Sequence, residues 1–224
     1  MSGMETTNVP GDDAAAPRHL AGLVLFAARY CLSGPDEEVH RILGDAAWWG
    51  SLEEAGLAPG QPSGSPVDLE QHRSLYQAFF WIPGNAFVPP YEQAYREGKA
   101  TVDSSATAAC TSIYRVAGYD AAPFDDVQRD HIGHQLRFLS ALLEREADCR
   151  DQDDIGAASR VVSWEEGFLA EHCWWWPRFT ERVLAMDPPA EMSAAVLLIA
   201  GLHAAMEARK GMAPSSNAGR PVGS

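Results

Sequence analysis

Apolar residues recur along most of this chain at intervals of three or four, which is the period of an amphipathic helix. One stripe opens a long helix and contains Ile132, Leu136, Leu139, Leu142 and Leu143. Another lies near the C-terminus and contains Met192, Val196, Ile199, Leu202 and Met206. No segment shows the strict alternation of a half-buried strand. The pattern predicts an all-α fold, a single-domain bundle of about seven or eight helices.

Proline, glycine and capping residues indicate where these helices begin and end. The first is expected from Pro17 to the stop at Ser33-Gly34-Pro35, and Asp36 is expected to cap the second. A third is predicted over residues 68–81, and Asp125 or Asp126 is expected to cap the long helix.

Three further boundaries follow from the same signals. A helix of small residues is predicted over 102–118, ending at a glycine. The charged stretch 144–154 is expected to separate the long helix from another over 157–186. The last helix is expected to begin near Pro188-Pro189. Residues 1–16 and 213–224 are predicted to be disordered tails around a helical domain at 17–212.

The net charge of −14 changes the picture of what this domain can bind. An acidic surface repels phosphate backbones, which disfavours nucleic acid as a partner. The same field attracts a cationic partner, although plain solubility explains it equally well. Four widely spaced cysteines without a C-x-x-C pair indicate reduced thiols, not a metal knuckle or a disulfide framework.

The N-terminal region lacks the features of a secretory leader. Residues 1–16 contain three acidic residues and no basic one, whereas a leader needs a positive start. The apolar run 20–32 is interrupted by Arg29 and is too short to span a bilayer. We therefore expect a cytoplasmic protein.

Common enzyme motifs are absent, including G-x-G-x-x-G, the P-loop, H-E-x-x-H and G-x-S-x-G. His131 and His134 could share a helical face, but no further ligand accompanies them, and we expect neither metal nor cofactor. The run Trp174-Trp175-Trp176 covers most of a helix circumference, which indicates core packing, or a partner surface for the residue left outside.

An aromatic segment followed by prolines is the most informative part of the chain. It begins at Tyr76 with Phe79, Phe80 and Trp81, crosses the stiff Pro89-Pro90 loop, and continues to Tyr91 and Tyr95. Such a loop can hold apolar rings beside an open groove for a peptide. The alternative is an ordinary packed corner between helices.

At these residues the sequence resembles the TorD/DmsD/NarJ family of molybdoenzyme maturation chaperones. The similarity lies in Phe79-Phe80 with Pro83-Gly84, in Pro90-Tyr91-Glu92 before Tyr95, and in Asp130-His131 opening a long helix. A weaker match is Phe168 and His172 followed by Trp175-Trp176-Pro177. This chain lacks the Glu-Pro that often precedes Asp-His in the family, and Gln93 stands where serine is common.

The resemblance implies a non-enzymatic chaperone, monomeric or a domain-swapped dimer. Its partner would be the catalytic subunit of a molybdopterin oxidoreductase, recognised by its twin-arginine leader, its apo-enzyme body, or both. The leader-contacting positions carried over are Tyr76, Phe79, Phe80, Pro90, Tyr91, Asp130 and His131.

Each carried-over group has a role that suits a basic, then apolar, leader. The aromatic rings would receive the apolar stretch. Asp130 would accept guanidinium hydrogen bonds, which are strong because they are charge-assisted. His131 would orient Asp130 or donate to a peptide carbonyl, with binding sensitive to pH around its ordinary pKa of about 6.5. Two alternatives are a helical adaptor that binds folded partners without a leader and a metal-dependent enzyme using His131 and His134.

Overall fold

The computed structural model describes residues 12–96, 105–120 and 126–210, and within these ranges it contains ten helices and no strand. The helices are α1 (Asp12–Ser33), α2 (Glu37–Leu43), α3 (Ala46–Glu54), α4 (Leu69–Phe80), α5 (Gln93–Arg96), α6 (Ser105–Ala117), α7 (Ile132–Asp151), α8 (Ile155–His172), α9 (Trp176–Leu184) and α10 (Ala190–Arg209). The all-α prediction is confirmed, with more helices than the seven or eight expected.

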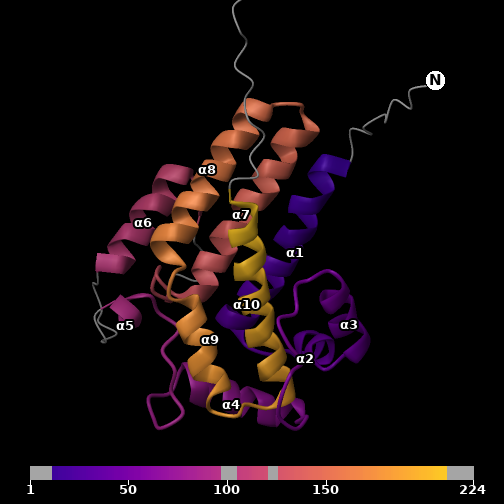
Figure 1. Ribbon diagram of the computed structural model, residues 1–224. Coiled ribbons are helices and arrows are strands. Elements are labelled where there is room, and N and C mark those ends of the chain that lie inside the picture. Colours follow the sequence, from indigo (N-terminus) through magenta and orange to yellow (C-terminus); the bar gives the residue numbers. More distant parts are fainter. Residues whose placement is uncertain (1–11, 97–104, 121–125, 211–224) are drawn as a thin grey trace, which may run out of the picture.

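The long helices α1, α7, α8 and α10 form the centre of the molecule (Figure 1). The most extensive contact joins α1 to α7, followed by α7 to α8, while α10 packs mainly on α9 and α1. The small α2 and α3 flank one side, α6 lies beside α8 on the other, and α4 crosses the lower end (Figure 1). The predicted site residues lie partly on α4, which carries Tyr76, Phe79 and Phe80, and partly in the segments before α5 and α7.

Aromatic and aliphatic side chains from distant segments fill the core. Trp175 and Trp176 have no exposed surface, and Phe138 on α7 meets Phe168 on α8 with ring centroids 4.7 Å apart. Gly133 lets the first turn of α7 approach α1, because a Cβ there would lie 2.5 Å from the Leu32 side chain. Burial of this much apolar surface is the main source of stability.

Several predicted boundaries agree with the structure because the capping chemistry is simple. The Asp36 carboxylate accepts a hydrogen bond from the Val39 N–H, and that of Asp68 accepts one from Gln71 N–H, as N-caps do. The predicted start of the first helix at Pro17 is wrong, because α1 begins at Asp12, within the predicted tail 1–16, and contains Pro17 in its interior.

The predicted start of the long helix is wrong. Instead of Asp125 or Asp126, the His131 side chain caps α7 by accepting from the Gly133 N–H. Histidine rarely serves as an N-cap, which is why the sequence favoured the acidic residues. Residue 125 lies outside the described ranges.

The division of the C-terminal half also differs from expectation. The charged stretch 144–154 mostly continues α7, which ends at Asp151. The helix expected over 157–186 breaks into α8 and α9 around Cys173–Trp175, just before Pro177. Residues 1–11 and 211–224, on which the predicted tails largely fall, lie outside the described residues.

The C-terminal helix α10 is long and apolar enough to pass for a membrane span by length and composition. However, 61% of its most apolar window is buried inside the protein. Five other helices pack against it, namely α1, α2, α4, α8 and α9. This is the pattern of a core helix, which is apolar on every side because neighbours surround it.

Candidate functional site

The segment Pro90–Gln93 runs beside the residues that open α7. The Ile132 N–H donates to the Pro90 carbonyl at 2.9 Å, and the Glu92 N–H donates to the Asp130 carbonyl at 3.1 Å. Between them, Tyr91 and His131 form an isolated antiparallel bridge. The proline-braced loop and the Asp-His pair, which are distant in sequence, therefore lie side by side.

Asp130 fixes this arrangement from inside. Its side chain is fully buried, and one carboxylate oxygen accepts from the Thr107 hydroxyl at 2.7 Å while the other accepts from the Gln93 N–H at 3.1 Å. Burial raises the pKa of Asp130, and these hydrogen bonds oppose that effect. The carboxylate therefore ties α6 and the start of α5 to the entry of α7.

One ring nitrogen of His131 accepts a hydrogen bond, and the other has no hydrogen-bond partner among the described residues. Nδ1 accepts from the Gly133 N–H at 3.0 Å, which places the ring proton on Nε2. Among the described residues, buried Nε2 has no hydrogen-bond partner. The ring lies between Tyr91, 5.0 Å away, and Trp81, 6.2 Å away, measured between centroids.

The expected pH sensitivity of His131 is wrong. Burial, aided by neighbouring His134, lowers its pKa to about 3. The ring is therefore neutral throughout the physiological range, and Nε2–H is a permanent neutral donor.

The carried-over aromatic residues of α4 lie inside the protein. Tyr76, Phe79 and Phe80 are each only 5% exposed. The Tyr76 hydroxyl donates to the Cys31 carbonyl at 2.8 Å, and the Phe80 ring lies 5.7 Å from that of Phe179. Pro90 is buried as well, and Tyr91 is the one predicted contact residue that is partly exposed.

An open hollow of about 600 Å³ borders this end of α4. Its wall is formed by Leu32, Ser33, Gly34, Pro35, Asp36, Arg73, Tyr76, Gln77, Trp81 and Ile82. Gly34 has a φ of +73°, and a Cβ there would approach the Tyr76 ring to 2.8 Å, so the wall requires glycine at this position. Tyr76 thus contributes to the hollow through its ring face without being exposed.

Two rim residues, Trp81 and Ile82, belong to the aromatic segment but were not among the predicted contact residues. Trp81 is 39% exposed and Ile82 is 57% exposed, although both follow directly on the buried aromatic stripe of α4. Helix periodicity contains the signal, because the helix ends at Phe80 and the next residues leave its buried face. Trp81 also links the hollow to His131 through their ring contact.

Acidic groups accompany this surface. Asp36 lines the hollow and pairs with Arg29. Asp126 is exposed, and burial together with the Asp130 and Asp126 carboxylates raises the pKa of Tyr91. An apolar rim thus adjoins negative charge.

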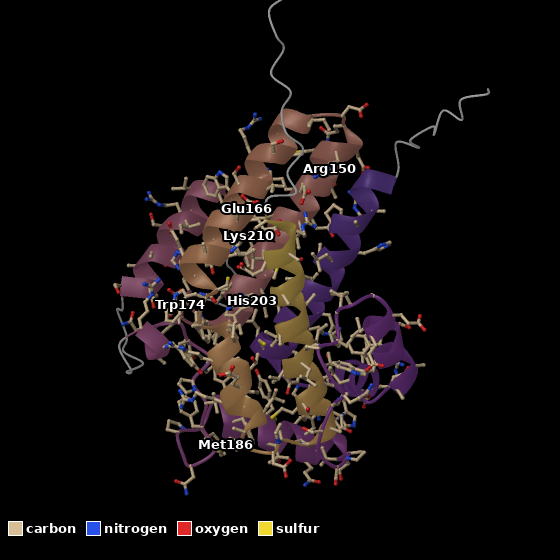
Figure 2. All side chains as sticks on the ribbon, in the orientation of Figure 1. Arg150, Glu166, Trp174, Met186, His203 and Lys210 are labelled. Atoms are coloured by element: carbon tan, nitrogen blue, oxygen red, sulfur yellow. The ribbon has the colours of Figure 1, made fainter. Side chains whose placement is uncertain are left out.

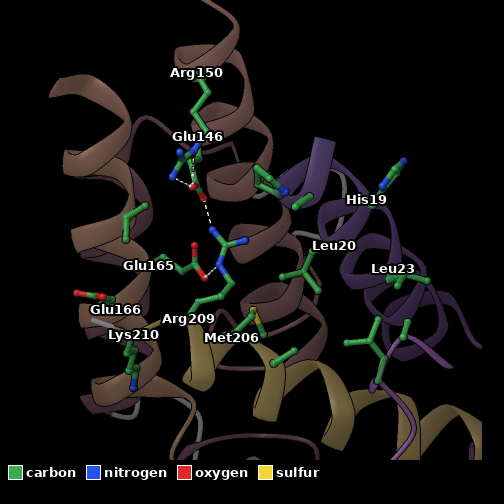
Figure 3. Close-up of a pocket in the computed structure, with 16 residues that line it drawn as sticks. His19, Leu20, Leu23, Glu146, Arg150, Glu165, Glu166, Met206, Arg209 and Lys210 are labelled. Carbon is green, nitrogen blue, oxygen red and sulfur yellow. Dashed lines mark hydrogen bonds and ion pairs between the residues drawn. The ribbon is translucent and has the colours of Figure 1, made fainter. Parts of the chain in front are cut away.

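A second hollow, of about 660 Å³, lies between α1, α7, α8 and α10 (Figure 3). Glu146 at its floor pairs with Arg150 and Arg209, while Glu165 has one carboxylate oxygen without a partner among the described residues. Burial raises the pKa of Glu165 to about 7, a shift that Arg209 opposes. No predicted site residue lies here.

The tryptophan run lies at the turn between α8 and α9 and not within one helix, with two rings buried and one partly exposed. Trp175 and Trp176 are buried, and their indole N–H groups donate to the His172 carbonyl and the Gln135 side-chain oxygen, each at 2.8 Å. Trp174 is half-buried (Figure 2). The guanidinium groups of Arg96 and Arg178 lie 5.8 and 5.7 Å from its ring centroid. This arrangement agrees with the packed-corner interpretation of the run.

Within the described residues, His131 and His134 belong to no group of three metal-ligand side chains. The group that does occur there is Glu92, Cys110 and His172. His172 is one of the residues on which the weaker family similarity depends.

Within the described residues, the fold and the site define an all-helical protein whose open hollow, rimmed by Trp81 and Ile82, adjoins a buried histidine with an unpartnered nitrogen. Residues 44–181, more than half of the chain, match the family model described as nitrate reductase delta subunit. The chain belongs to this family, the NarJ/TorD group of maturation chaperones, which are not enzymes.

Among solved structures, one similar chain is a candidate redox enzyme maturation protein from Archaeoglobus fulgidus. It is 19% identical, and the match covers 92% of this chain and 99% of that one with a TM-score of 0.47. No curated protein matches the sequence.

Proposed function

We propose that this protein is a cytoplasmic chaperone for the catalytic subunit of a molybdopterin oxidoreductase. It binds the twin-arginine leader of that subunit, its apo form, or both, and holds it until the cofactor has been inserted. The binding domain is the helical body that begins with α1, and it acts as a monomer or a domain-swapped dimer. Family membership supports the chaperone role, and the site supports peptide recognition.

The unpartnered Nε2–H of His131 is the observation on which peptide recognition rests. A buried donor without an acceptor is costly, and a ligand carbonyl that reaches Nε2 by displacing a neighbouring ring would remove that cost. The flanking rings of Tyr91 and Trp81 offer an apolar face to the same ligand. An extended peptide supplies both features, a backbone carbonyl and neighbouring side chains.

The surrounding surface suits a basic peptide that becomes apolar. Trp81 and Ile82 form an exposed apolar rim, and the hollow behind them is large enough for one or two side chains. Asp126 and the net charge of −14 would attract the arginines and speed the encounter. Asp130 acts indirectly in this scheme, by holding Tyr91 and His131 in place.

The test measures binding of a fluorescent synthetic peptide with two consecutive arginines followed by an apolar stretch. Trp81→Ala should weaken binding at least tenfold, because an aromatic anchor at an interface contributes on that scale. Trp164→Ala is the matched control, since Trp164 is also 39% exposed but lies on α8. A peptide with both arginines replaced by glutamine tests the charge contribution.

Two outcomes would redirect the proposal. Equal binding by the wild type and Trp81→Ala would show that the hollow is not part of the recognition site. Retention of a leaderless apo-enzyme with no affinity for the peptide would favour recognition of the enzyme body, as in the adaptor alternative.

A further inference from the structure

Three buried side chains from separate segments converge on one point in the interior. Glu92 precedes α5, Cys110 lies on α6, and His172 ends α8. We propose that Glu92, Cys110 and His172 form a binding site for one zinc ion. The proposal is independent of leader recognition and departs from the expectation of no metal.

The distances between the three ligand atoms fit the face of a tetrahedron. Cys110 Sγ lies 3.5 Å from His172 Nδ1 and 3.8 Å from Glu92 Oε2, and Nδ1 lies 3.0 Å from Oε2. Zinc bonds of about 2.0–2.3 Å at tetrahedral angles separate neighbouring ligand atoms by roughly 3.4–3.6 Å. An ion therefore fits with shifts of a few tenths of an ångström.

The donor set selects the class of metal. Thiolate, imidazole and carboxylate are the three side-chain ligands that zinc commonly takes. Calcium and magnesium require oxygen ligands, and a sulfur ligand makes them poor occupants. Among divalent ions, zinc or a close substitute such as cobalt suits this set.

Surrounding groups already orient the ligands. Arg96 Nε donates to Glu92 Oε1 at 2.5 Å, and Gln135 Nε2 donates to Oε2 at 2.8 Å. Gln135 is itself fixed by the indole N–H of Trp176. His172 Nε2 lies 4.0 Å from the Glu171 carboxylate, beyond direct hydrogen-bond distance, so Nε2 is available to carry the ring proton when Nδ1 binds the ion. Outer partners of this kind are a regular feature of metal sites.

The site has an approach from solvent. His172 lines an open hollow of about 730 Å³ together with Arg96, Ala106, Ala109 and Trp174. A water molecule on this side can complete four-coordination. Glu92 and Cys110 have no exposed surface and do not line the hollow, so the ion would enter past His172 by a local opening. When bound, the ion would link the Tyr91–Gln93 segment to α6 and α8.

The alternative is a hydrogen-bonded cluster without an ion. In that arrangement the Cys110 thiol and the His172 Nδ1–H both donate to Glu92 Oε2. The zinc site instead requires a thiolate and an unprotonated Nδ1. On binding, the thiol proton leaves to solvent and the imidazole proton is exchanged from Nδ1 to Nε2. Spectroscopy of the thiolate bond distinguishes the two.

The experiment uses full-length protein purified without a polyhistidine tag, stripped with a chelator and titrated with cobalt. We expect one cobalt per chain, with a near-ultraviolet thiolate-to-cobalt absorption band and the visible bands of tetrahedral cobalt, all lost on adding zinc. Zinc should also raise the melting temperature of the wild type by several degrees.

Cys110→Ser should abolish the near-ultraviolet band, while Cys149→Ser should keep it, since Cys149 is a half-buried cysteine outside the cluster. Should Cys110→Ser fail to fold, His172→Gln provides the second variant and should abolish tetrahedral binding. A wild type without the thiolate band, or a band that persists in folded Cys110→Ser, would overturn the proposal and leave a hydrogen-bonded cluster.

Discussion

Tyr91 and His131 pair through a single antiparallel bridge, and their rings meet edge to face with centroids 5.0 Å apart. The bridge joins the proline-braced loop to the N-terminus of α7. It also holds the buried, unpartnered Nε2 of His131 close to a partly exposed tyrosine. The predictions below test how this junction is held and what it does.

The buried carboxylate of Asp130 should matter for stability more than for direct peptide contact. Asp130→Asn keeps the shape but removes one of two acceptors, for Thr107 or for Gln93 N–H, and should lower the free energy of unfolding by about 1–2 kcal/mol. Chemical denaturation measures this.

Asp126→Asn is the matched control, because Asp126 is exposed. It should leave stability nearly unchanged and weaken binding of the diarginine peptide at low salt. If Asp130→Asn is stable but loses peptide binding severely, while Asp126→Asn has no effect, then Asp130 contacts the peptide arginines directly.

His131 should contribute to binding through Nε2 and in a pH-independent way. His131→Asn keeps a good helix cap but removes the Nε2 donor, and should weaken peptide binding roughly tenfold, the equivalent of about 1.4 kcal/mol. Since the pKa of His131 is lowered to about 3, wild-type affinity should show no step from this group between pH 5.5 and 8. A step near pH 6.5 that vanishes in the variant would contradict this assignment.

Glu165 should make stability depend on pH in the neutral range. Its pKa is about 7 in the folded protein against an ordinary 4.5, so between these values the folded state holds a proton that the unfolded state has lost. Stability should therefore fall as pH rises from 4.5 to 7 and level off above.

Glu165→Gln should remove this contribution and be more stable than the wild type at pH 8, by roughly 1–3 kcal/mol. Thermal unfolding of both proteins between pH 5 and 8 measures the difference. Glu166→Gln, one residue along α8, is the control and should retain the wild-type slope. Parallel curves for wild type and Glu165→Gln would show that the carboxylate is charged and solvated.

Gly34 should be required for the wall of the hollow. Gly34→Ala combines a left-handed backbone with a Cβ that would lie 2.8 Å from the Tyr76 ring, and should cost about 1–3 kcal/mol of stability. Gly84→Ala is the control, since the nearest atom to its Cβ would be 3.9 Å away. Comparison of their denaturation midpoints checks this, and equal midpoints would mean that the loop adjusts freely.

Periodicity predicted the helical class because the stripes on α7 and α10 are long and regular. It did not find α3 or α5, since nine or four residues provide too few turns for a pattern. The break between α8 and α9 was missed because the apolar pattern continues through the tryptophan run, and only Pro177 marks it.

For the site, the sequence predicted which segments meet but not which side chains are exposed. Phe80 is buried because Phe179, about a hundred residues later, covers it, and no local pattern contains that contact. The His131 cap was missed for a related reason, since a neutral imidazole acceptor depends on burial that the sequence does not reveal.

The burial of α10 among other helices limits how two copies of this chain could form a domain-swapped dimer. A helix that is apolar all round and surrounded by five others would expose its whole circumference if it left its own subunit. Any swapping would therefore have to move α10 together with α9, with which it packs most, and hinge before Trp176, where the chain already bends between α8 and α9.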